Sequence, residues 1–188
     1  MLTFDESTHT FRRDGQVVPS VTQILKACGL VRDYGPSTWA RDRGTRVHQA
    51  MFALSTTNED AALACLEPED VPYFDAAQTW MVTNGVTVLG AEEVVDAGYY
   101  AGWLDLRCTL RGVSGPCVVD FKTGTLPPWA GLQLAAYAAP LGEVHTRYAV
   151  RLQSNGQPQM KLYTNRNDLI NFNACARVVQ LQADYGRD

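Results

Sequence analysis

Two aspartates and a lysine between residues 101 and 124 are the residues whose types and spacing best suit chemistry. Asp120 and Lys122 stand two apart, so in a strand both side chains point to one face, and Asp105 precedes them on another strand-like segment. Two carboxylates held close together repel each other unless a cation neutralises them, and Mg²⁺ needs only one or two carboxylates because it keeps several waters. A neighbouring lysine can orient a water or stabilise negative charge that develops on a phosphate. The spacing therefore favours a metal site for phosphate chemistry.

The pairing of these segments decides whether the three side chains meet. If the hairpin pairs Leu110 with Cys117, Asp105 lies opposite Lys122, and both aspartates share one face with the lysine. The alternative is a surface ion pair across a hairpin, which contributes little to stability. The opposite face of the same strands is expected to enter the core through Leu104, Val119 and Phe121.

The surrounding pattern changes from helical to strand-like near residue 86. Helices are predicted at residues 21–28, 38–54, 59–66, 71–84, 127–139 and 168–185. Strands are predicted at residues 2–4, 10–12, 16–18, 86–89, 93–95, 99–110, 117–122, 146–153 and 159–163. This order predicts an α/β fold with a mixed central β-sheet flanked by helices. We expect one domain over residues 1–188, with an N-terminal hairpin and helices at 1–85, a sheet core at 86–140, and a C-terminal hairpin and helix at 141–188.

Two of the predicted helices carry further polar side chains. Gly44 and His48 stand four apart, as do Gln133 and Tyr137, so each pair shares one helix face. An imidazole in an otherwise oxygen-rich site suits Mn²⁺ somewhat better than carboxylates alone. The alternatives are a polar residue at a helix edge for His48 and an amphipathic packing helix for Tyr137, which would leave Gln133 unexplained on the inward stripe.

Five short motifs in this sequence resemble those of the PD-(D/E)XK nucleases, in the order found in their RecB-like exonuclease branch. The motifs are R-G-x-x-x-H from Arg43 to His48, the strand glutamate Glu92, Gly102-x-x-Asp105, Asp120-Phe121-Lys122, and Gln133-x-x-x-Tyr137. The sequence departs from the family pattern at Leu104, where the family name has a proline. The resemblance spans roughly residues 19–137 and implies the restriction-endonuclease-like α/β core.

The resemblance also implies roles for single residues. It implies a Mg²⁺ or Mn²⁺ site whose ligands are His48, Asp105, Asp120 and the carbonyl of Phe121. It implies a catalytic set of Glu92, Asp105, Asp120 and Lys122, with Glu93 as an alternative to Glu92. Gln133 and Tyr137 would touch the active site and the DNA backbone.

The charge is distributed unevenly along the chain. The formal net charge is −4, yet the segment from Val47 to Leu106 has ten acidic residues and no Lys or Arg, which leaves 16 basic and 10 acidic residues elsewhere. We expect the acidic segment to be solvated and away from DNA. We expect the basic remainder to contact DNA phosphates through Arg41, Arg43 and Arg46.

The cysteines and the apolar segments bear on compartment and cofactor. The five cysteines are scattered without a C-x-x-C pair, which favours reduced thiols in a cytoplasmic protein. Some RecB-like relatives hold an iron–sulfur cluster with three cysteines downstream of the core, whereas only Cys175 follows Lys122 here, so we expect no cluster. The start resembles no signal peptide, and no apolar run is long enough to span a membrane.

Together these features predict a metal-dependent deoxyribonuclease. The free-standing size and the missing P-loop resemble phage-type exonucleases of recombination or DNA degradation, located in the host cytoplasm. Two alternatives remain open, a structure- or sequence-specific endonuclease on the same core and a non-catalytic DNA-binding module. The expected partner is DNA rather than a membrane, and a homo-oligomer or a recombination partner protein stays open.

Overall fold

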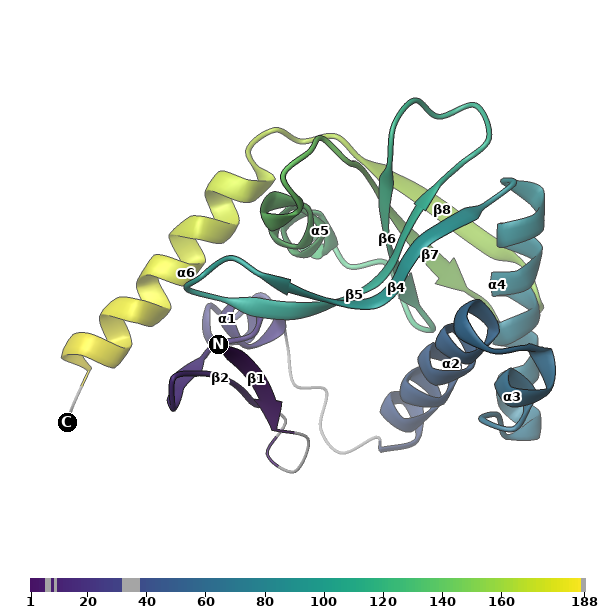
Figure 1. The fold of residues 1–188 in the computed structure, drawn as a ribbon, viewed down its shortest axis with the longest axis horizontal. Coiled ribbons are helices and arrows are strands. Elements are labelled where there is room, and N and C mark those ends of the chain that lie inside the picture. The colour runs from purple at the N-terminus through teal and green to yellow at the C-terminus, as the bar shows by residue number, and fades with distance from the viewer. Residues whose placement is uncertain (6–7, 9, 32–37, 187–188) are drawn as a thin grey trace.

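The computed structural model describes residues 1–5, 8, 10–31 and 38–186, and within them the chain forms two β-sheets with helices on both faces of the larger one (Figure 1). The larger sheet has the strand order β4-β5-β6-β7-β8. Its pairs are antiparallel except for β6 and β7, which run parallel, so the sheet is mixed. Its strands are β4 (Thr87–Asp96), β5 (Ala101–Thr109), β6 (Cys117–Lys122), β7 (Thr146–Leu152) and β8 (Pro158–Tyr163).

Two groups of helices cover the two faces of this sheet. One apolar cluster joins α2 (Thr38–Thr56) and α4 (Val71–Thr83) to buried side chains of β5, β6 and β7. A second cluster joins α1, α5 and α6 to the opposite face. The remaining helices are α1 (Val21–Ala27), α3 (Glu59–Leu63), α5 (Ala130–Ala138), α6 (Asp168–Tyr185) and the 3₁₀ turns η1 (Pro68–Asp70) and η2 (Ala139–Leu141).

A small antiparallel sheet at the N-terminus packs against the start of β5. It consists of β1 (Leu2–Asp5), β2 (Thr10–Arg13) and β3 (Gln16–Val18). Phe4 and Phe11 contact Trp103 with ring centroids 5.5 and 6.2 Å apart, and the Ala101 N–H donates to the Pro19 carbonyl. The small sheet therefore supports the strand that carries Asp105.

The α/β class and the mixed sheet flanked by helices are confirmed. Several boundaries differ: residues 87–96 form one strand rather than two, the helix predicted at 59–66 ends at Leu63, the strand predicted at 99–110 spans 101–109, and α5 begins at Ala130 because the preceding Pro127 and Pro128 lie in a loop. Within the described residues, none of the helices combines the length and apolar character needed to cross a bilayer.

The predicted register of the β5–β6 hairpin is wrong by two residues. Cys117 pairs with Cys108 rather than with Leu110, and continuing this register places Asp105 opposite Asp120. The difference arises because Leu110 already belongs to the turn, where its carbonyl accepts from the Val113 N–H. A shift of two residues leaves the alternation of faces unchanged within the paired stretch, and Asp105, Asp120 and Lys122 still lie close enough to shift one another's pKa values.

Leu104 does not follow the prediction that it shares a core face with Val119 and Phe121. It packs with Val118 in the cluster under α5, whereas Val119 and Phe121 pack with Trp80 of α4. The neighbouring strand β4 has a register shift between residues 88 and 90, opposite Cys108 and Arg107, and irregularities of this kind re-aim side chains next to functional sites.

Candidate metal and catalytic site

Three adjacent strands and one helix bring the candidate residues together. Asp105 comes from the middle of β5, Lys122 ends β6, Glu92 comes from β4, and His48 comes from the third turn of α2. The apolar side of α2 is buried on the sheet through Val47, Ala50 and Met51, and this packing holds His48 against β5 and β6.

His48, Glu92 and Asp105 form one compact group. Nδ1 of His48 lies 3.5 Å from Asp105 Oδ1 and 3.8 Å from Glu92 Oε1. Nε2 of His48 lies 3.1 Å from the Phe121 carbonyl oxygen, and this contact turns Nδ1 toward both carboxylates. Asp105 is fixed from its other side, because its Oδ2 accepts from the Phe121 N–H at 2.7 Å.

Burial and neighbouring charges shift the pKa values of three side chains at this site. Burial disfavours the imidazolium, but Asp105 and Glu92 outweigh burial and hold the pKa of His48 well above its usual value. Burial also acts against the Asp105 carboxylate, yet His48, Lys122 and the Phe121 N–H together lower the pKa of Asp105. Burial raises the pKa of Asp120 to about 6, although Lys122 stabilises its charged form. The surroundings thus favour a cation beside these acids.

A second chain of contacts starts at Asp120 and runs to α5. Lys122 Nζ lies 2.9 and 2.8 Å from the two Asp120 oxygens, and it donates to Gln133 Oε1 at 3.2 Å. Gln133 Nε2 donates in turn to the Tyr137 hydroxyl at 3.0 Å. Gln133 and Tyr137 are 5% exposed, so these predicted DNA contacts are buried supports of Lys122 instead.

Gly102 makes room for this chain of contacts. A Cβ at residue 102 would lie 2.7 Å from Tyr137 Cε1, closer than real Cβ atoms approach, and would make a tight contact of 3.3 Å with Val21 Cγ2. The glycine three residues before Asp105 therefore has a packing reason, since any side chain there would displace the Tyr137 ring.

The donor atoms present fit a divalent cation. One ligand atom each from His48, Glu92 and Asp105 lies within 4.8 Å of the others. Asp120 is 2% exposed, and its Oδ2 accepts no well-aligned hydrogen bond although Lys122 Nζ is near. Carboxylate oxygens with one imidazole suit Mg²⁺ or Mn²⁺, and the metal charge would relieve the crowding of the acids.

Glu92 and Glu93 have different surroundings. Glu92 has φ of 48°, in the left-handed region that non-glycine residues seldom adopt, and such outliers cluster at functional sites. Glu93 instead accepts from Arg107 at 2.8 and 2.9 Å, and this pair holds the pKa of Glu93 below its usual value. Of the two glutamates, Glu92 lies beside His48.

The three predicted DNA-contacting arginines are unequal. Arg43 is 7% exposed, lies between the rings of Trp39 and Tyr73, and donates to the Thr123 carbonyl. Arg46 donates to the fully buried Asp70, at 3.1 Å for Nη2. Both guanidiniums are engaged within the fold, and their contact with DNA stays a prediction. Arg41 is exposed beside Asp42 and keeps its predicted role as a candidate contact.

A groove of about 880 Å³ opens beside the site. His48, Phe121 and Lys122 line it, together with the segment 123–129 and the residues that follow α1. The candidate residues are thus reachable from outside.

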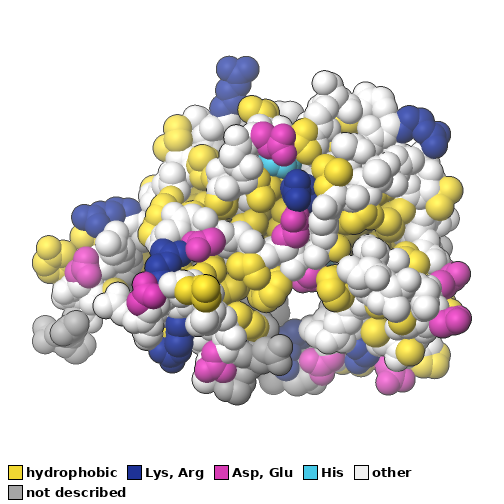
Figure 2. Space-filling model, in the orientation of Figure 1, with side chains coloured by type: hydrophobic (Ala, Val, Ile, Leu, Met, Phe, Trp, Pro, Cys, Tyr) yellow, Lys and Arg dark blue, Asp and Glu magenta, His cyan; other side chains and the backbone are white. Residues whose placement is uncertain are grey.

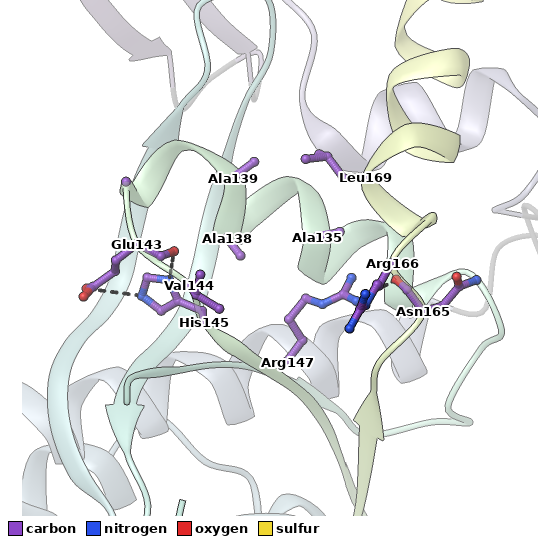
Figure 3. Close-up of a pocket in the computed structure, with 11 residues that line it drawn as sticks. Ala135, Ala138, Ala139, Glu143, Val144, His145, Arg147, Asn165, Arg166 and Leu169 are labelled. Carbon is purple, nitrogen blue, oxygen red and sulfur yellow. Dashed lines mark hydrogen bonds and ion pairs between the residues drawn. The ribbon is translucent and has the colours of Figure 1, made fainter. Parts of the chain in front are cut away.

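A second hollow, of about 460 Å³, lies at the other end of the parallel strands (Figure 3). Arg147 at the start of β7 donates there to the carbonyls of Gly131 and Asn165 and to Asp168, and His145 Nδ1 lies 3.0 Å from the Glu143 carbonyl. None of the predicted site residues lines it.

Two residues outside the five motifs lie close to Lys122 in the fold. Arg151 of β7 lies opposite Lys122 in the parallel β6–β7 pair, and Trp129 has its ring centroid 5.7 Å from Lys122 Nζ. The motif spacing offers no signal for Arg151, because parallel pairing of distant strands is not visible in the sequence. The sequence does point to Trp129, because it lies one helical turn before Gln133.

No protein-family model matches this chain, and no curated protein matches it in sequence. Among solved structures, its fold is similar to that of an alkaline exonuclease from Laribacter hongkongensis, with a TM-score of 0.44 and 11% sequence identity. The similarity covers 77% of this chain and 93% of the exonuclease chain. At this identity, a function for the chain has to come from its own residues.

Proposed function

We propose that this protein is a metal-dependent deoxyribonuclease that hydrolyses phosphodiester bonds. The observation that carries the proposal is the position of Lys122. Its ammonium is held by Asp120 and Gln133 in the lining of a groove, while His48, Glu92 and Asp105 lie on the neighbouring strands and helix. A fixed cation beside a cation-binding group of acids is the arrangement that attack on a phosphate requires.

Each residue has a task in this proposal. Asp105, Glu92 and His48 would hold a Mg²⁺ or Mn²⁺ ion, with Asp120 and the Phe121 carbonyl completing the donor set. When bound, the metal supplies Lewis acidity and lowers the pKa of a water. Lys122 stabilises negative charge on the phosphate oxygens or orients the attacking water, and Gln133 and Tyr137 keep its ammonium in place.

The motif resemblance makes the proposal more specific. The order of the five motifs is that of RecB-like PD-(D/E)XK exonucleases, so we expect a phage-type exonuclease acting in recombination or DNA degradation. A structure- or sequence-specific endonuclease would use the same residues. We expect no iron–sulfur cluster, and the purified protein should be colourless.

Cleavage of linear and covalently closed DNA tests the proposal. We expect loss of linear DNA with Mg²⁺ or Mn²⁺, survival of closed circles, and poor turnover with Ca²⁺. Nicking of closed circles would assign an endonuclease instead. Cleavage that persists in excess EDTA would contradict metal dependence, and the absence of cleavage with either metal would leave only DNA binding.

A further inference from the structure

The groove beside Lys122 has mostly apolar walls. The side chains that form them include Leu30, Val31, Leu126, Trp129 and Leu132. The hydroxyl groups of Thr123 and Thr125 and the backbone of Gly124 complete the segment that follows β6. A groove of this composition suits the flat apolar face of a nucleobase better than it suits a row of phosphates.

Charge is scarce along the groove. Among the described residues that line it, Lys122 is the sole Lys or Arg, and its ammonium is already engaged by Asp120 and Gln133. The neighbouring Arg43 turns inward and donates to the Thr123 carbonyl, so it shapes the wall and is withdrawn from solvent. Proteins that hold duplex DNA neutralise several phosphates with Lys and Arg, whereas the described lining of this groove offers one such cation.

Trp129 and Lys122 both line the groove. Trp129 is half-buried, it directly precedes α5, and its ring lies 5.7 Å from Lys122 Nζ. Because α5 also carries Gln133, one helix positions both the ring and the partner of the lysine. A base stacked on this ring would bring the attached phosphate next to the ammonium.

We propose that the groove binds an unpaired DNA strand end, with a nucleobase stacked on Trp129 and its phosphate presented to Lys122. The inference rests on the proposed nuclease function and adds the substrate class and the residue that selects it. Aromatic stacking is tolerant of sequence, so the preference is for unpaired over paired ends.

Binding in Ca²⁺ tests the role of Trp129. The probe is a labelled single strand of about 20 nucleotides, compared with a blunt hairpin duplex of the same sequence by fluorescence anisotropy. Trp129→Ala is expected to weaken single-strand binding about 5- to 150-fold, whereas Trp129→Phe retains a stacking face and most of the affinity. Tyr185→Ala, an exposed aromatic at the far end of α6, is the matched control and leaves the affinity unchanged.

A double-mutant cycle separates stacking from a structural role. Abasic nucleotides at the strand ends should weaken binding by the parent protein and have little further effect on Trp129→Ala. The inference would be overturned if Trp129→Ala and the abasic nucleotides weakened binding additively, or if the protein bound a blunt duplex as tightly as the single strand. Cleavage of the same oligonucleotides in Mn²⁺ is measured in parallel. If the parent protein cleaves them but Trp129→Ala and the abasic ends show no coupling in binding, the stacking role alone is rejected. If the parent protein cleaves none of them, the nuclease function is rejected.

Discussion

At the scale of single residues, Lys122 is held by two partners of different kinds. Asp120 provides a buried negative charge, and Gln133 provides a neutral oxygen fixed by Tyr137. Burial opposes the ammonium, but Asp120 and Asp105 outweigh it and keep the pKa of Lys122 above its usual value. The lysine is therefore suited to electrostatic stabilisation rather than to proton donation near neutral pH.

Lys122→Ala is expected to lose turnover by about 10²- to 10⁴-fold while keeping its fold and its Mn²⁺ affinity. Asp120→Ala should lose metal binding and turnover together. Calorimetric Mn²⁺ titration beside single-turnover cleavage measures both quantities. Lys161→Ala on β8, an exposed lysine beside Tyr163, is the matched control. A parental cleavage rate for Lys122→Ala would reduce the residue to an ion-pair partner of Asp120.

The two adjacent glutamates give a prediction of their own. Glu92→Gln should weaken Mn²⁺ binding by about tenfold or more, because Glu92 lies beside His48 and Asp105. Glu93→Gln should leave the metal affinity at the parental value, because its carboxylate is bound by Arg107. Calorimetric titration of both variants makes the comparison, and the reverse order of affinities would assign the site to Glu93.

At the scale of elements, much of the site could be predicted before the sheet was known. The spacing of Asp120 and Lys122 defines one face of a strand, and the spacing of Gln133 and Tyr137 defines one face of a helix. The register between strands could not be predicted, because it depends on where the turn begins, and Leu110 joins the turn. The burial of Arg43 also depends on distant elements, since Tyr73 and the residue 123 carbonyl reach it only in the fold.

The contact between β5 and α5 yields a prediction about Gly102. Gly102→Ala is expected to lower the free energy of unfolding by about 1–3 kcal/mol, because the added methyl group overlaps the buried Tyr137 ring. Displacing Tyr137 also loosens Gln133, so turnover should fall further than stability alone explains. Urea unfolding measures the first effect. Gly124→Ala is the stability control, since a Cβ there meets nothing within 4 Å. Equal midpoints for Gly102→Ala and the parent would contradict this packing.

At the scale of the whole molecule, the charges do not form a continuous basic surface on the face shown in Figure 2. There, single Lys and Arg side chains are scattered among acidic ones. The net charge of −4 fits this picture, as does the inward orientation of Arg43 and Arg46. Attraction for a nucleic acid would then be concentrated at Arg41, at Arg151 next to Lys122 on the sheet, and at the metal itself.

Because the metal would offset mutual repulsion among buried acids, its binding should stabilise the entire domain. At a Mn²⁺ concentration about 100 times its Kd, linkage predicts a gain of about 2.7 kcal/mol, which for a chain of this size raises Tm by about 5–10 °C. Asp105→Asn should abolish most of this rise, because Asp105 is central to the donor group. Asp60→Asn, an exposed acid of α3 in the acidic segment, should show the parental rise. Thermal unfolding with and without Mn²⁺ needs no substrate, so it tests the metal site independently of cleavage. Equal rises in the two variants would mean that Mn²⁺ binds elsewhere, and the proposed site would then lose its metal.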